Sequence, residues 1–136
     1  MLSLRVSVLG VFGVLLASAC VPHRDVPAND IPKLTALKDV MDVQATVADP
    51  QMSKAGQASY TDADWTAFAD VSTRIQATST KAKDFSKGPE FDQLADRLNG
   101  TAVALGKAAE AKDNAAASKA LGDMKATCKE CHKKFK

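Results

Sequence analysis

The spacing of apolar residues in the C-terminal half of the chain is the strongest constraint on its fold. One set of apolar side chains recurs three or four residues apart, at Phe91, Leu94, Leu98, Ala102, Leu105 and Ala109. After a turn at Lys112-Asp113-Asn114, the same rhythm resumes at Ala117, Leu121, Met124, Cys128, Cys131 and Phe135. Because this spacing places side chains on one face of a helix, it predicts two long helices, each burying one stripe against its neighbours.

Two further helices are predicted upstream of this pair. The first is expected from about Pro32 to Val47, with Asp30 as its N-cap and Asp49-Pro50 at its end. The second is expected to begin at Thr61-Asp62-Ala63-Asp64, which is typical of a capped helix start, and to stop before Lys87-Gly88-Pro89. The side chains predicted to face inward from it are Trp65, Phe68, Val71, Ile75 and Ala82.

The predicted fold class is all-α, because no segment alternates β-branched and polar residues as a strand would. Four amphipathic helices with short connections favour an antiparallel up-down-up-down four-helix bundle in which the first and last helices are neighbours. The predicted core has few large side chains to fill it, since the chain has one Trp, one Tyr and five Phe. Gly100 and Gly106 are expected to let a neighbouring helix approach closely. A large group held inside the bundle is expected to fill the remaining space.

The first twenty residues have the pattern of an export signal. A positive start at residues 1–5 and an apolar stretch at 6–16 lead to Ala17-Ser18-Ala19-Cys20. We expect a signal peptide at 1–19, a tether at 20–29 and one bundle domain at 30–136, in a bacterial periplasm. Two processing routes stay open: Ala-x-Ala suits ordinary signal peptidase, whereas Leu16 to Cys20 resembles a lipobox, with Ala17 where leucine is usual. On the second route an acylated Cys20 tethers the domain to a membrane face.

The charge and residue types of the chain argue against two classes of function. Lys and Arg number 18 and Asp and Glu 16, a net +2 that becomes +1 when Arg5 leaves with the signal (17 minus 16). A near-neutral chain has no global field to attract nucleic acid. The sequence contains no serine nucleophile elbow and no glycine-rich phosphate loop, so we expect a protein that is not an enzyme.

The segment Cys128-Lys129-Glu130-Cys131-His132 is the attachment signature of c-type haem. Cysteines three residues apart share one helix face and can each form a thioether to a haem vinyl group, while His132 is held under the iron as proximal ligand. A zinc site is a weaker alternative, because it needs about four ligands and the remaining candidates are Cys20 and His23. A redox-active dithiol and a structural disulfide are further minor alternatives.

The sequence resembles the class II cytochromes c, the family of cytochrome c′ and its low-spin relatives. The resemblance rests on a CxxCH motif near the C-terminus of a four-helix pattern, on Phe135 three residues beyond the histidine and on a final basic residue. It implies one covalently attached haem c in a periplasmic monohaem cytochrome that carries single electrons. Some members of the family pair as homodimers, and the sequence leaves this oligomeric state open.

The ligand on the distal side of the iron separates two functions. A methionine there makes a low-spin electron carrier with a raised potential, whereas an empty distal side leaves room for nitric oxide or carbon monoxide. Low-spin members draw this methionine from the first helix, where Leu37-Lys-Asp-Val-Met41 resembles the relevant segment, so Met41 is the predicted distal ligand. The alternative is that Met41 is a core residue beside a five-coordinate, cytochrome c′-like iron.

Five lysines surround the haem-attachment motif despite the near-neutral charge of the chain. They are Lys125, Lys129, Lys133, Lys134 and Lys136. We expect them either to orient the haem edge toward an acidic redox partner protein or to serve only local electrostatics, since cations near a helix C-terminus are favoured by its dipole.

Overall fold

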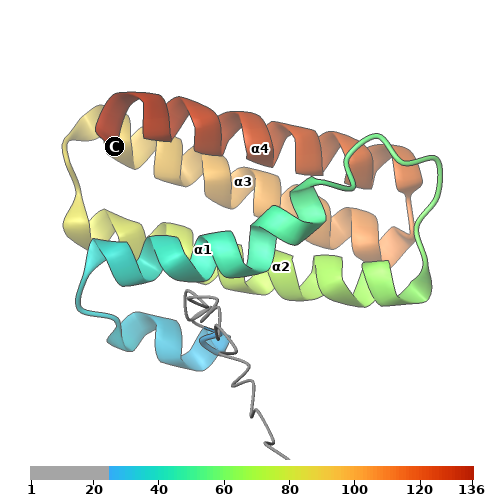
Figure 1. The fold of residues 1–136 in the computed structure, drawn as a ribbon, viewed down its shortest axis with the longest axis horizontal. Helices are drawn as coiled ribbons and strands as arrows, with labels where there is room; N and C mark the ends of the chain where they lie inside the picture. Colours follow the sequence, from blue (N-terminus) through green and yellow to red (C-terminus); the bar gives the residue numbers. More distant parts are fainter. Residues whose placement is uncertain (1–24) are drawn as a thin grey trace, which may run out of the picture.

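The computed structural model describes residues 25–136, whose backbone is mostly helical (Figure 1). The four long helices are α1 (Leu37–Met52), α2 (Asp62–Ala82), α3 (Pro89–Ala111) and α4 (Asn114–Phe135). Two short 3-10 segments, η1 (Ala28–Lys33) and η2 (Lys83–Phe85), accompany them, and residues 25–136 contain no strand. The predicted all-α four-helix bundle is therefore confirmed. The predicted signal peptide and Cys20 lie outside the described residues.

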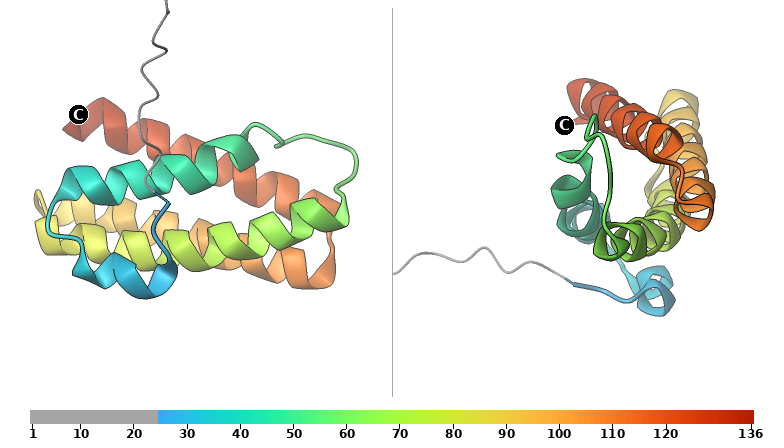
Figure 2. Two further views of the ribbon diagram at one scale, coloured as in Figure 1. Left: turned by 60° about the horizontal axis from the view of Figure 1, so that its bottom comes forward. Right: turned by 90° about the vertical axis from the view of Figure 1, so that its right-hand side faces the viewer.

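The helices run alternately up and down the bundle, so that α1 and α3 point one way and α2 and α4 the other (Figures 1 and 2). Helix α3 packs closely on both α2 and α4, and α1 packs mainly on α2. Helices α1 and α4 are in contact as expected, but theirs is the sparsest packing among the neighbouring pairs of long helices. No helix in the described part of the chain is long and apolar enough to cross a membrane.

The prediction of a first helix from about Pro32 to Val47 is wrong at both ends. Asp30 lies inside η1 and does not cap α1, whose N-cap residue is Ala36. At the other end α1 continues through Pro50 to Met52. Burial of Val47, Ala48 and Met52 favours the helical path, and Ser53 Oγ donates a hydrogen bond of 2.7 Å to the Pro50 carbonyl. Pro50 has no N–H to donate to the Thr46 carbonyl, so α1 continues past it with one hydrogen bond missing.

Segment η1 packs on α2 and buries Ile31 completely. Asp25 forms an ion pair with Arg74 of α2, which also pairs with Asp70. The predicted tether at 20–29 is described only from residue 25, and η1 crosses its predicted boundary with the domain at residue 30. The domain limits otherwise stay predictions.

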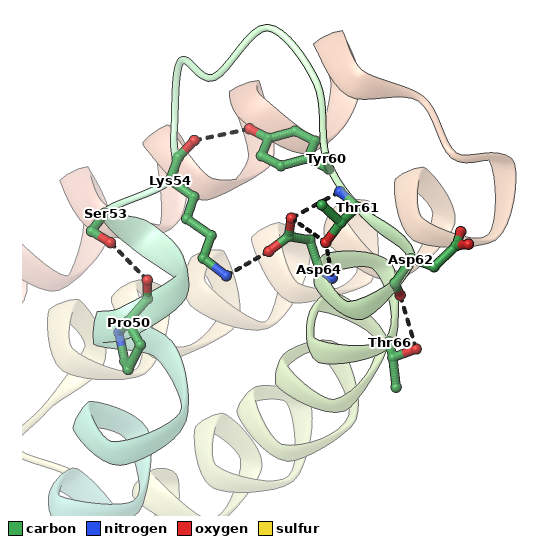
Figure 3. A network of polar contacts seen from close by, with 8 residues as sticks. All are labelled: Pro50, Ser53, Lys54, Tyr60, Thr61, Asp62, Asp64 and Thr66. Carbon is green, nitrogen blue, oxygen red and sulfur yellow. Dashed lines mark hydrogen bonds and ion pairs between the residues drawn. The ribbon is translucent and has the colours of Figure 1, made fainter.

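Helix α2 begins with the predicted cap at Thr61 (Figure 3). The Thr61 hydroxyl accepts a hydrogen bond of 3.2 Å from the Asp64 amide, and Asp64 Oδ2 accepts one of 2.8 Å from the Thr61 amide. Lys54, from the loop after α1, lies 2.5 Å from Asp64 Oδ1. This network fixes the start of the α1–α2 loop to the first turn of α2. The side chains predicted to face inward from α2 are all buried.

Asp64 should make the stability of the bundle sensitive to acid. Its hydrogen bonds with Lys54 and Thr61 lower the pKa of the Asp64 carboxyl from 3.8 to about 2. A depressed pKa stabilises the folded state above the unfolded pKa, and this contribution is lost as the pH falls from about 4 through about 2. We expect Asp64→Asn to unfold at lower urea concentration at neutral pH and to lose less stability on acidification. If the wild-type protein and Asp64→Asn lost the same amount of stability between pH 5 and about 2, this assignment would be contradicted.

The contact between α2 and α3 depends on Gly106. A Cβ atom at this position would lie 2.4 Å from Ser72 Oγ and 3.2 Å from Ser72 Cβ. The Ser72 hydroxyl cannot move freely, because it donates a buried hydrogen bond of 2.7 Å to the Ala102 carbonyl. Gly106 therefore allows the close approach that the sequence predicted. The same prediction for Gly100 is wrong, since Gly100 is exposed and no atom lies within 4 Å of an added Cβ.

These two glycines make a matched pair for measuring stability. We expect Gly106→Ala to lower the free energy of unfolding by about 1–2 kcal/mol, because the overpacking cost exceeds the gain in helix propensity. Gly100→Ala should raise it by about 0.5–1 kcal/mol, since only the propensity gain applies. Urea denaturation measures both, and equal effects at the two positions would argue against the Ser72 contact.

The buried side chains form two clusters at different places along the bundle. The main cluster contains Trp65, Phe68, Leu105 and Leu121 and is closed by edge-to-face contacts among Tyr60, Trp65 and Phe68. The second cluster has only Val40, Ala82 and Phe91 as fully buried members. Partly buried side chains complete it, namely Leu34, Leu37, Met41, Phe85, Cys131 and Phe135. The second cluster lies at the end of the bundle that carries the predicted haem motif.

Candidate haem site

Helix α4 presents the predicted attachment residues in its last two turns. The helix starts at a clear cap, where the Asp113 side chain accepts a hydrogen bond from the Ala116 amide. Its inward stripe continues through Met124 to Cys128 and Cys131, which are both partly buried free thiols. Cys128 packs against the main cluster and Cys131 against the second. His132 follows directly and is exposed.

Burial raises the pKa of both thiols. The pKa of Cys128 rises to about 11, mainly through desolvation and then through the negative charges of Asp49 and Cys131. Burial also raises the pKa of Cys131, with Lys87 opposing the shift and Glu130 adding to it. Redox-active dithiols need a lowered pKa to supply the thiolate. The environment therefore disfavours the dithiol alternative.

A cavity of about 440 Å³ lies between α1 and α4 beside the motif. Helix α1 contributes Leu37, Met41 and Ala45 to its wall, and the end of α4 contributes Cys131, His132 and Phe135. Phe91 of α3 also lines the cavity and packs edge-to-face on Phe135, with ring centroids 5.4 Å apart. This volume is in the range of cofactor sites, and it occupies the sparsely packed boundary between α1 and α4.

A second, inner cavity of about 30 Å³ continues from this space into the bundle. Its wall draws on all four helices, including Gln44 of α1, Ser79 of α2, Leu98 of α3 and Cys128 of α4. Four residues line both cavities: Met41, Phe91, Cys131 and His132. The two spaces therefore meet where the motif of α4 faces Met41 of α1.

The other methionines of the described residues do not line this site. Met52 and Met124 are buried in the main cluster, and neither lines either cavity. Met41 is partly buried and lies on the wall of both cavities. The structure thus brings together Met41, Cys128, Cys131 and His132, the four described residues that the sequence predicted for the site.

The mouth of the larger cavity is positively charged. Lys38, Lys87 and Lys136 lie on its wall together with one carboxylate, Asp42, which pairs with Lys38 at 2.6 Å. Lys87 Nζ donates a hydrogen bond of 3.1 Å to the Phe135 carbonyl at the end of α4. Haem carries two propionate carboxylates, so cations at the rim suit this group.

The residues around the two cavities fit a covalently attached haem. Two thiols three residues apart and an adjacent imidazole stand beside largely apolar walls, which is the donor set that the motif predicts. The buried amide nitrogen of Gln44 has no hydrogen-bond partner within the protein. Residues 25–136 contain no group of three or more His, Cys, Asp or Glu side chains that could hold a metal ion by themselves.

Sequence reasoning missed Gln44 and Lys87 as residues of this site. Gln44 follows Met41 by three residues, so a polar side chain on an otherwise apolar helix face was the available signal. Lys87 belongs to the helix-breaking segment Lys87-Gly88-Pro89, and nothing in its sequence neighbourhood indicates that it faces the end of α4.

Comparison with known proteins agrees with this site. The profile of the family described as Cytochrome C′ matches residues 32–136. Cytochrome c′ of Pararhodospirillum photometricum is 40% identical over 70 residues, which make up 52% of this chain and 56% of that protein. The chain is thus matched to little more than half of that relative's length, and no solved structure matches it. Because the family profile covers the whole bundle and the motif, the chain belongs to the cytochrome c′ family of class II cytochromes c, which bind one covalently attached c-type haem.

Proposed function

We propose that this monohaem cytochrome is a periplasmic one-electron carrier with an iron ligated by His132 and Met41. In this proposal Cys128 and Cys131 form the two thioether links to the haem. The supporting observation is that Met41 of α1 and His132 of α4 line the same two cavities from opposite helices. Bound haem supplies an iron that gains or loses one electron, and an axial methionine raises its reduction potential.

The protein residues around the site have roles that suit electron transfer. The apolar walls limit access of water, and Phe91 and Phe135 pack on each other beside the motif. Exposed lysines at the cavity mouth and along the end of α4 would hold the haem carboxylates and present a positive rim. We infer an electron carrier and not an enzyme, with an acidic protein as redox partner.

A second candidate function is binding of nitric oxide or carbon monoxide at a five-coordinate iron. Two observations favour it: the matched relative is named cytochrome c′, and Met41 is only partly buried beside a cavity of about 440 Å³. In this case Met41 would remain a wall residue of the pocket, and His132 would be the only axial ligand from the protein.

Optical spectra of the haem-loaded protein distinguish the two candidates. Spectra are recorded for the oxidised protein, for the reduced protein and for the reduced protein under carbon monoxide. We expect a low-spin spectrum with a methionine-to-iron charge-transfer band and no response to carbon monoxide. A high-spin spectrum that shifts under carbon monoxide would instead support the gas-binding function and reject Met41 as ligand.

We also propose that the protein lies in the periplasm. The export signal pattern at residues 1–19 and the family support the periplasm, and acylated Cys20 would add a membrane tether. Mass spectrometry of the mature N-terminus measures whether Cys20 carries a lipid.

A further inference from the structure

Gln44 is a buried polar side chain on the wall of the inner cavity. Only 9% of its surface is exposed, and its amide nitrogen Nε2 has no hydrogen-bond partner. Most of the neighbouring inward residues on α1 are apolar, including Val40, Val43 and Val47. Buried donors in folded proteins nearly always have an acceptor. An acceptor for Gln44 is therefore expected when the site is complete.

The acceptors that line the same cavity are few. The hydroxyls of Ser79 and Thr127 donate within their own helices, to the Ile75 carbonyl at 2.6 Å and the Asp123 carbonyl at 2.8 Å, and neither oxygen accepts from Gln44 Nε2. The sulfur of Met41 remains on the same wall. Residues three apart on a helix are surface neighbours, so Met41 and Gln44 lie side by side on α1. A thioether sulfur is a weak acceptor of hydrogen bonds.

We propose that Gln44 Nε2 donates a hydrogen bond to the Met41 sulfur in the haem-loaded protein. This inference rests on the proposed function, in which Met41 is the distal ligand. Gln44 is then a positioning residue that holds the thioether toward the iron. The hydrogen bond also draws electron density from the sulfur, which favours the reduced iron and raises the potential, because outer-shell hydrogen bonds tune metal ligands.

The inference is tested by removing the donor while keeping the size of the side chain. Gln44→Leu is compared with Gln51→Leu, a matched control on the same helix. Gln51 also has a buried unpaired atom, its Oε1, but it lines neither cavity. The reduction potential and the methionine-to-iron charge-transfer band are measured on both haem-loaded variants. Gln44→Ala is a second variant, in case leucine disturbs the fold.

We expect Gln44→Leu to shift the electron-exchange equilibrium toward the oxidised protein by about tenfold, equal to about 59 mV for one electron. Its charge-transfer band should move, and Gln51→Leu should leave both quantities unchanged. A low-spin wild-type protein whose potential and band are the same in Gln44→Leu would overturn this inference alone. A high-spin wild-type spectrum would overturn both this inference and the proposed function.

Discussion

Cys128→Ala combined with Cys131→Ala is expected to abolish covalent haem attachment. The two thiols are the only cysteines in residues 25–136, and both lie on the wall of the inner cavity. Without them no thioether can form from this helix face, so haem that enters the site is held only by ligation and packing. Haem staining after denaturing electrophoresis measures the result, because thioether-linked haem survives denaturation. Wild-type protein should stain, and the double variant should not.

The third cysteine of the chain supplies the control for this experiment. Cys20→Ala removes the predicted lipidation residue and leaves Cys128 and Cys131 in place. It should stain as strongly as the wild-type protein when equal amounts are loaded. Staining retained by the double variant would show that another residue holds the haem, and it would reject the assignment of the motif.

Met41→Ala is expected to convert a low-spin haem into a high-spin, five-coordinate one. Met41 is the only methionine in residues 25–136 that lines the two cavities. The variant therefore leaves no methionine sulfur on the cavity walls that could bind the iron opposite His132. The charge-transfer band should disappear, the reduction potential should fall and carbon monoxide should bind the reduced iron. The fall should be large, because axial-ligand identity sets haem potentials over a range of about 0.8 V.

Met52→Ala separates loss of ligation from loss of packing. Met52 is buried in the main cluster at the far end of α1, so its truncation should cost about 2–5 kcal/mol of stability. The haem spectrum of Met52→Ala should nevertheless remain low-spin. If Met41→Ala instead kept the wild-type spectrum and potential, Met41 would be a wall residue of the pocket and not an iron ligand.

The fold was largely predictable because apolar spacing and turn residues agree over most of the chain. The stripes from Phe91 to Ala109 and from Ala117 to Met124 are buried as predicted. Thr61 and Asp113 cap the helices that follow them. In each case a local signal and the burial pattern favour the same structure, which is the condition for reliable inference from sequence. The position of the motif residues on the cavity wall was predictable for the same reason, since it depends on short-range spacing, whereas their roles at the haem stay predictions.

The differences arise where tertiary packing overrides a local signal. Proline at position 50 indicates a helix end, yet burial of Met52 carries α1 two residues further. Asp30 and Pro32 have the composition of a helix start, but Ile31 is drawn into a contact with α2 and the segment becomes η1. Gln44 was missed because its importance depends on the cavity around it, which involves all four helices. No pattern within α1 alone contains that information.

The unequal size of the two buried clusters affects the order in which the two ends of the bundle fold. Most of the apolar contacts lie in the main cluster, whereas the second has three fully buried members and borders the large cavity. Local opening is easiest where buried apolar contacts are few. The end with Trp65 and Phe68 can therefore become ordered first, while the first turns of α1 and the last turns of α4 are still apart. The chain would then present Cys131 for haem attachment while only part of the bundle is folded, and bound haem would complete the packing of the other end.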